Sequence, residues 1–204
     1  MPFTNYSDLK TSVANYLGRS DLTSVIPDFI GFAELRLSRD LRTRQMLKSA
    51  TASTVGGDGK VALPTDFLEL RDLHVQGNPR MPLTYLSPSA FTRDAWADES
   101  GKPTFYTILA TELELAPMPD TSYTLEILYY AKPTVLSNTT ASNVFLANYP
   151  DALLYAALGE AEPYLMNDAR LQTWGALYDR AISTINVADQ SSEYGGQPMS
   201  MSVR

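Results

Sequence analysis

The sequence predicts an α+β fold: an antiparallel helical bundle, built from N-terminal helices and a C-terminal αα-hairpin, with an inserted small antiparallel β-rich domain. Apolar residues recur at helical spacing near both ends of the chain, whereas the middle alternates in short runs between Gly and Pro turns. The predicted segments are 1–47 (N-terminal helices), 48–131 (β-rich domain with one short helix), 132–190 (connector and helical hairpin) and 191–204 (flexible tail).

The C-terminal hairpin has the clearest helical pattern. Its first apolar stripe consists of Leu154, Leu158, Ala161 and Leu165. Its second stripe consists of Leu171, Trp174, Tyr178, Ala181 and Ile185. The break at Asn167 and Asp168 is short, which predicts antiparallel neighbours. Pro163 interrupts the first helix at a cost of roughly 3 kcal/mol. We therefore expect a kink there, required either by curvature around the core or by a subunit interface.

The first 50 residues predict two further helices. The first spans 5–17, with Asn5 or Ser7 as the N-cap and Gly18 as the stop. The second has Pro27 in its first turn. Its apolar face carries Ile26, Ile30, Ala33, Leu37 and Leu41.

Basic side chains gather at the end of the second helix, at Arg36, Arg39, Arg42 and Arg44. Residues 1–50 carry seven basic and five acidic side chains, whereas the remainder carries nine and eighteen. Arginine near a helix C-terminus is what the helix dipole favours. The alternative is a basic patch that faces a partner or DNA.

The middle of the chain predicts five to seven strands. A hairpin is expected around the Gly56-Gly57-Asp58-Gly59 turn, between 51–55 and 60–63. Further strands are expected at 68–75, 81–86, 104–109, 112–115 and 123–130. A short helix that begins at Ser87-Pro88 carries Phe91 and Trp96. Residues 131–148 read as a polar connector.

Composition excludes several classes of function. The net charge of −7 and pI near 4.7 argue against a general nucleic-acid binder. The absence of cysteine excludes disulfides, thiol catalysis and thiolate metal sites. Neither a secretory signal nor an apolar run of 18 residues is visible. We expect a soluble protein synthesised in a cytoplasm.

No arrangement of residues predicts catalysis, a cofactor or a metal. His74 is the single histidine and alternates within a strand, so a satisfied or solvent-facing side chain is expected. Asp66 and Asp72 lie near it without a nucleophile turn. Glu160 and Glu162 should point to different helix faces. The expectation is a protein that is not an enzyme.

Tyrosine is abundant, with twelve residues. Several fall in the second half: Tyr106, Tyr123, Tyr129, Tyr130, Tyr149, Tyr155 and Tyr164. Tyrosine is enriched at protein interfaces, whereas base stacking needs a basic surround. Residues 103–204 hold four basic and eleven acidic groups, so the interface interpretation is favoured.

An ordered set of segments resembles the head-to-tail adaptor (connector) proteins of tailed bacteriophages, over residues 5–190. The segments are F-I-G-F-A-E-L-R-L-S-R-D-L-R (29–42), L-P-T-D-F-L-E-L (63–70), G-K-P-T-F-Y-T (101–107), E-L-E-L-A-P-M-P (112–119), Y-T-L-E-I-L-Y-Y-A-K-P (123–133) and P-D-A-L-L-Y-A-A-L-G-E-A-E-P-Y-L (150–165).

The resemblance implies a virion structural protein, synthesised in the host cytoplasm and located in the neck between portal and tail. It implies a homo-oligomeric ring of twelve subunits that contacts the portal protein and a tail or nozzle protein. Genomic double-stranded DNA would pass through without sequence-specific binding, and no membrane is involved. The implied portal-docking tail contains Glu193, Tyr194, Gly195, Gly196, Met199 and Met201.

Two alternatives remain open from the sequence. The first is a neck or tail-completion protein lower in the virion. The second is a host-surface or glycan-binding module with a small hydrolase activity, for which Asp66 or Glu69 would supply the acid.

Overall fold

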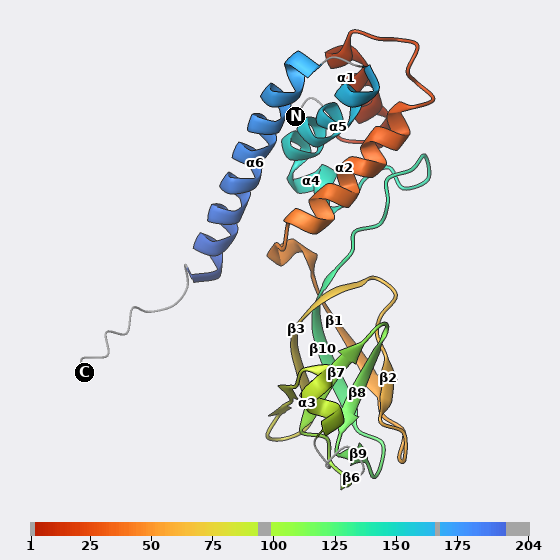
Figure 1. Cartoon of the computed structure of the whole chain (residues 1–204), viewed down its shortest axis with the longest axis vertical. Helices are drawn as coiled ribbons and strands as arrows, with labels where there is room; N and C mark the ends of the chain where they lie inside the picture. The colour runs from red at the N-terminus through yellow and green to blue at the C-terminus, as the bar shows by residue number, and fades with distance from the viewer. Residues whose placement is uncertain (1–2, 94–98, 166–167, 195–204) are drawn as a thin grey trace, which may run out of the picture. The chain divides into compact units, whose positions relative to one another are not determined.

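The computed structural model describes residues 3–93, 99–165 and 168–194, and Trp96, Gly195, Gly196, Met199 and Met201 lie outside them. The chain divides into two compact units. The helical unit comprises 1–46 and 133–204, and the β unit comprises 47–132. Helices come from both ends of the chain and strands from the middle, which confirms the predicted α+β class (Figure 1).

The helical unit is organised around α5 (Pro150–Leu165). This helix is apolar around nearly its whole circumference, and Leu153, Leu154, Ala157, Leu158 and Ala161 are all buried. It packs against α1 (Tyr6–Leu17), α2 (Ile26–Asp40), α4 (Val144–Asn148) and α6 (Asp168–Tyr194). Figure 1 shows α5 between α2 and α6. The α helix continues through Pro163 to Leu165.

The first two helices begin and end for local reasons. Asn5 Oδ1 accepts the Asp8 N–H at 2.9 Å and so caps α1. Gly18 ends α1 with φ of +65°, a conformation that glycine adopts without strain. In α2, Pro27 lies in the first turn and the predicted apolar stripe is buried.

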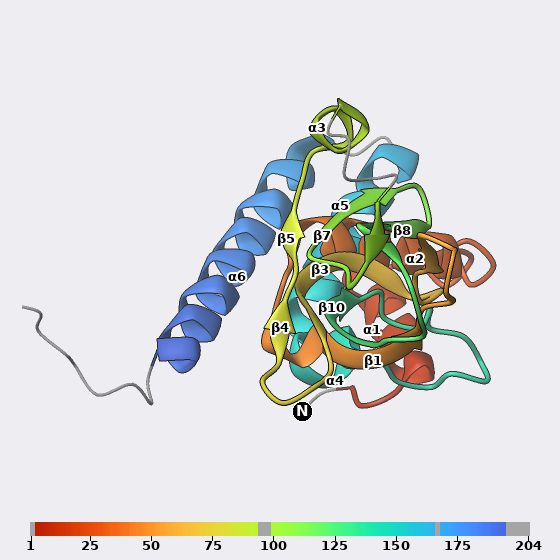
Figure 2. The same ribbon diagram turned by 90° about the horizontal axis from the view of Figure 1, so that it is seen from below.

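The last helix is longer than the sequence predicted. α6 has 27 residues and runs to Tyr194, so Ser191 and Ser192 are helical, although they were assigned to the tail. Glu193 and Tyr194 form its last two positions. Figures 1 and 2 show α6 along one side of the helical unit. Among its described side chains, Tyr178 and Ala181 are the buried ones.

The connector is tied to α2 by a buried carboxylate. Glu34 accepts hydrogen bonds from the Leu136 N–H, 3.1 Å from Oε1, and from the Asn143 side-chain amide. Asn143 also accepts the Leu146 N–H at 3.0 Å and so caps α4. The predicted polar connector, 131–148, therefore ends in a helix that the sequence did not indicate. Phe145 and Leu146 are buried there, which stabilises the short helix.

The β unit contains two four-stranded sheets. The first has the order β1 (Leu47–Ser53), β10 (Thr124–Ala131), β3 (Phe67–Val75), β4 (Met81–Pro82). The second has the order β2 (Lys60–Ala62), β8 (Glu112–Ala116), β7 (Phe105–Leu109), β5 (Thr84–Tyr85). Both are antiparallel except for the short β5–β7 pair.

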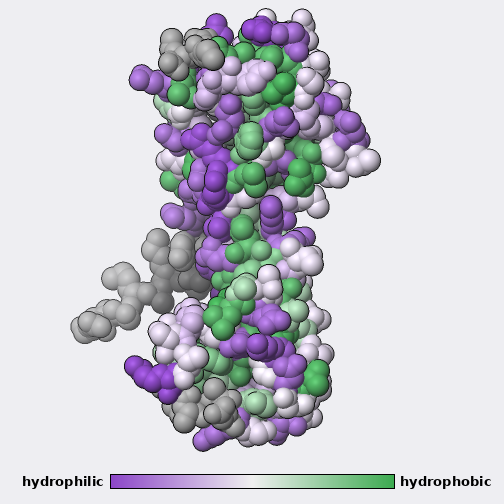
Figure 3. Space-filling model, turned by 45° about the vertical axis from the view of Figure 1, so that its right-hand side comes forward, coloured by the Kyte–Doolittle hydropathy of each residue, from purple (hydrophilic) through white to green (hydrophobic). Residues whose placement is uncertain are grey.

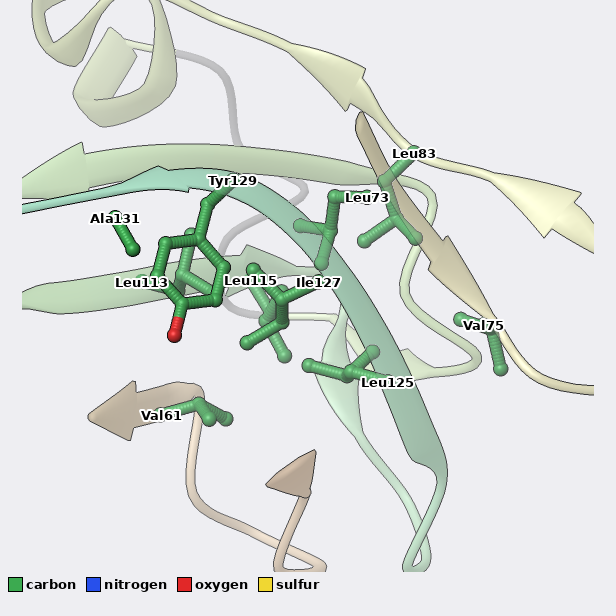
Figure 4. Close-up of a cluster of buried hydrophobic side chains, with 10 residues drawn as sticks. All are labelled: Val61, Leu73, Val75, Leu83, Leu113, Leu115, Leu125, Ile127, Tyr129 and Ala131. Carbon is green, nitrogen blue, oxygen red and sulfur yellow. The ribbon is translucent and has the colours of Figure 1, made fainter. Parts of the chain in front are cut away.

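Smaller elements complete the β unit. They are α3 (Pro88–Arg93), which buries Phe91, and the parallel pair β6 (Ser100–Gly101) and β9 (Met118–Pro119). Side chains from both sheets meet in one core, which includes Val61, Leu113, Leu125, Ile127 and Tyr129 (Figure 4). Alternation along β10 is regular, because every second residue from Leu125 to Ala131 is buried.

The predicted hairpin between 51–55 and 60–63 is wrong. β1 pairs with β10 and β2 pairs with β8, so the glycine-rich loop carries the chain from one sheet to the other. The loop packs closely on the backbone of residues 119–123. Gly57 N–H donates to Pro119 O at 2.8 Å, and a Cβ on Gly56 would lie 3.0 Å from Asp120 O. The glycines therefore serve a close backbone approach.

Replacing Asn143 with alanine tests the connector. The substitution removes the α4 cap and one hydrogen bond to buried Glu34, so we expect the free energy of unfolding to fall by about 1–3 kcal/mol. Chemical denaturation measures the change. Asn138→Ala, at an exposed position in the same connector, is the matched control. Equal effects of the two substitutions would contradict the assigned role.

Glu34 also predicts a pH effect. Burial raises the pKa of its carboxyl above 4.5 in the folded state. Ionisation of Glu34 therefore does not lower the free energy of unfolding below about pH 4.5. It lowers this free energy progressively as the pH rises through the raised pKa. The unfolding free energy of Glu34→Gln, relative to that of the unsubstituted protein, should therefore increase from pH 4.5 to pH 8. Parallel urea titrations measure it, and a falling difference contradicts the prediction.

Candidate partner-binding surfaces

Arg36 holds three helices of the helical unit together. Its Nε lies 3.9 Å from Asp40 Oδ2 on α2, and its Nη1 lies 3.7 Å from Glu160 Oε1 on α5. Its guanidinium carbon lies 4.1 Å from the centre of the Tyr178 ring on α6, a cation–π contact. The i, i+4 pair with Asp40 is thus part of a larger network.

Tyr178 closes this network from α6. Its hydroxyl donates to Asp40 Oδ2 at 2.7 Å. Burial and the neighbouring carboxylate together raise the pKa of Tyr178, so the hydroxyl stays protonated and continues to donate. Arg36 therefore has an internal structural role, whatever else it contacts.

The other three arginines of the predicted patch differ in exposure. Arg42 Nη1 donates to the carbonyl oxygens of Ser38 and Leu41, both at 2.7 Å, and so satisfies the C-terminus of α2. Arg39 and Arg44 are exposed. Arg36 and Arg39 lie in α2, whereas Arg42 and Arg44 follow it, and the structure gives Arg36 and Arg42 intramolecular bonds.

Arg44 borders a cleft beside the C-terminal half of α6. The Arg44 N–H donates to Asp189 Oδ1 at 3.1 Å, and Tyr149 OH donates to Gln45 Oε1 at 2.7 Å. The cleft has a volume of about 270 Å³. Its lining includes Arg44, Gln45, Tyr149, Ile185, Asp189 and Ser192. The cleft therefore lies next to the C-terminal end of α6, after which the chain continues as segment 195–204.

A second, more apolar cleft of about 410 Å³ lies between the N-terminal segment, α1 and the start of α5. Its lining includes Phe3, Tyr16, Pro150, Leu154 and Tyr155. Tyr155 stacks on Trp174 with ring centres 6.4 Å apart. The sequence did not predict either cleft, because each is built from segments more than 100 positions apart.

Most of the tyrosines proposed for interfaces also make internal contacts. Tyr129 is buried and its hydroxyl donates to Asp66 at 2.8 Å, while Tyr123 OH donates to Asp120 at 2.8 Å. Burial raises the pKa of Tyr129 to about 12. Of the seven residues named from the sequence, Tyr164 is the exposed one, at 56%. The count of tyrosines alone therefore overstates the surface available to a partner.

Four of the titratable side chains considered from the sequence, at positions 74, 66, 160 and 162, make local contacts. His74 Nε2 lies 3.0 Å from Glu126 Oε2, as expected for a satisfied strand histidine. Asp66 lies 2.7 Å from Lys48 Nζ, and this bond lowers the pKa of its carboxyl. Glu160 faces Arg36, whereas buried Glu162 accepts the Trp174 Nε1–H at 2.9 Å, so the two point apart as predicted.

Residues 3–93, 99–165 and 168–194 contain no cluster of three or more His, Cys, Asp or Glu side chains placed to hold a metal ion. Within the same ranges, no helix has the length and hydropathy needed to cross a membrane.

A comparison with protein families gives a match. The family model described as SU10 adaptor protein matches residues 4–202, nearly the whole chain. No curated protein matches the chain.

The Arg36 network predicts a difference between two neighbouring arginines. Arg36→Gln should lower the free energy of unfolding by about 1–2 kcal/mol, because it removes the cation–π contact and both ion pairs. Arg39→Gln, at an exposed position three residues away, should change it by less than about 0.5 kcal/mol. Thermal and urea unfolding measure both variants. A change of similar size in both would show that the network contributes little.

Proposed function

The chain belongs to the SU10 adaptor protein family, a family of phage head-to-tail adaptors, and on this premise we propose that it joins the portal to the tail in the virion neck. The match over residues 4–202 carries the proposal. Membership of a structural adaptor family implies a protein that is not an enzyme.

We propose that twelve copies assemble into a ring whose lumen the genome crosses. The net charge of −7 supports passage without adhesion, because an acidic surface repels phosphate. Arg36 and Arg42 are engaged within the helical unit, which leaves Arg39 and Arg44 as the members of the predicted basic patch best exposed to a partner or the lumen.

We propose that the C-terminal segment 191–204 docks on the portal. Two observations support this: α6 carries the chain to Tyr194 along the side of the helical unit, and the residues beyond it include Gly195, Gly196, Met199 and Met201. Such a sequence is too polar and too rich in glycine to form its own core. A segment that orders on its partner makes assembly sequential, since the contact is completed at docking.

The proposal is tested by negative-stain electron microscopy of the purified protein, alone and mixed with the portal from the same virion. Rings stacked on portal particles are the expected result. Absence of both rings and portal binding at micromolar concentration would place the protein lower in the neck or tail.

Two truncations test the docking segment. Removal of 191–204 should leave a folded protein whose affinity for the portal falls at least about tenfold, or 1.4 kcal/mol. Removal of 195–204 preserves the whole of α6 and separates the helix end from the residues beyond it. Circular dichroism checks the fold, and sedimentation with portal particles measures binding. Unchanged affinity after removal of 191–204 would contradict docking through this segment.

A further inference from the structure

The outer face of α2 carries two exposed apolar side chains between two exposed charges. Phe32 is 55% exposed and Leu35 is 46% exposed, although Ile30 and Leu37 on the opposite face are buried. Asp28 and Arg39 lie on the same outer face, because positions 28, 32, 35 and 39 recur at i, i+4, i+7 and i+11. Figure 3 shows that hydrophobic residues lie among hydrophilic ones on the visible surface of the protein.

Neither charge has an ion-pair partner within the described part of the chain. Arg39 has no hydrogen-bond or ion-pair partner there, and Asp28 has no ion-pair partner. No described atom lies within 4 Å of a Cβ placed on Gly31, which flanks the same face. The face is thus open to another helix, and it presents both an apolar centre and complementary charges at its two ends.

The order of these residues is symmetric. From either end of the helix the order is a charged residue, two apolar residues and a residue of the opposite charge. The spacings between successive members are 4, 3 and 4 positions in both directions. Two antiparallel copies of α2 therefore place Asp28 against Arg39 at both ends and Phe32 against Leu35 at the centre. A parallel pair would instead place Asp28 against Asp28.

We propose that the free protein pairs with a second copy of itself through this face of α2, in an antiparallel, twofold-symmetric contact. A twofold contact closes after two copies, so it is distinct from the neighbour-to-neighbour contacts of a ring. It stands whether or not the chain acts as an adaptor. Antiparallel helix dipoles add to the charge complementarity.

The size of the face sets the expected strength. From Asp28 to Arg39 the helix rises about 16 Å, or three turns. A contact between two such short helix faces buries less area than the roughly 1,600 Å² of a standard stable interface. We therefore expect a reversible dimer with a dissociation constant in the micromolar range or weaker, and weaker still at high salt.

The symmetry allows a charge-swap experiment on the full chain, followed by analytical ultracentrifugation. Asp28→Arg alone places Arg against Arg at both ends of the dimer, and Arg39→Asp alone places Asp against Asp. Each should weaken dimerisation roughly tenfold. The double variant Asp28→Arg/Arg39→Asp restores both pairs and should dimerise again. Because all the substituted side chains are exposed, folding should be retained, and circular dichroism checks this.

A mixture of the two single variants gives an independent readout. One variant then supplies two basic ends and the other two acidic ends, so heterodimers should form where neither homodimer does. Phe32→Ser should weaken the dimer, whereas Val187→Ser, at a 64% exposed position on α6, should not. A monomer at several hundred micromolar would overturn the proposal. It would also be overturned by association that neither single variant weakens, or by failure of both the double variant and the mixture to restore pairing.

Discussion

Burial of α5 is the constraint on which the helical unit depends. Ala152, Leu153 and Leu154 are all buried, although successive residues point about 100° apart around an α-helix. Each leucine so buried contributes about 1.5–3 kcal/mol relative to an exposed side chain. One neighbouring helix cannot cover such a surface, so α1 and α2 from one end of the chain must meet α4 and α6 from the other. Residues 47–132 are consequently an insertion that leaves the helical unit and returns to it.

Polar groups then fix how the distant segments meet. Glu34 binds the connector more than 100 positions later in the chain, and Arg36 joins α2 to α5 and α6. Buried or half-buried charges are costly unless they are paired, so each such contact selects one arrangement of the helices. Most of the arginines and tyrosines that look available in the sequence are used in this way. Fewer side chains therefore remain for partners than composition suggests.

An adaptor must be folded before it meets its partners and must keep surface for them. The helical unit meets both needs, because its internal contacts centre on α5, while α6 and the outer face of α2 retain exposed side chains. The β unit is stabilised separately by the core between its two sheets. These features agree with the structural role of the family, in which surfaces rather than reactive groups perform the function.

The sequence by itself determined the class of fold and the main elements. The Asn5 cap, the Gly18 stop, the apolar stripe of α2 and the alternation in β10 are local patterns, and local patterns report helices and strands directly. Tertiary structure alone decided which strands pair, because the glycine-rich loop that reads as a hairpin is held by residues 119–123 instead. It also decided that α6 extends to Tyr194 and that Arg36 and Arg42 are engaged while Arg39 is exposed. Such outcomes depend on contacts between residues distant in sequence, which no local spacing encodes.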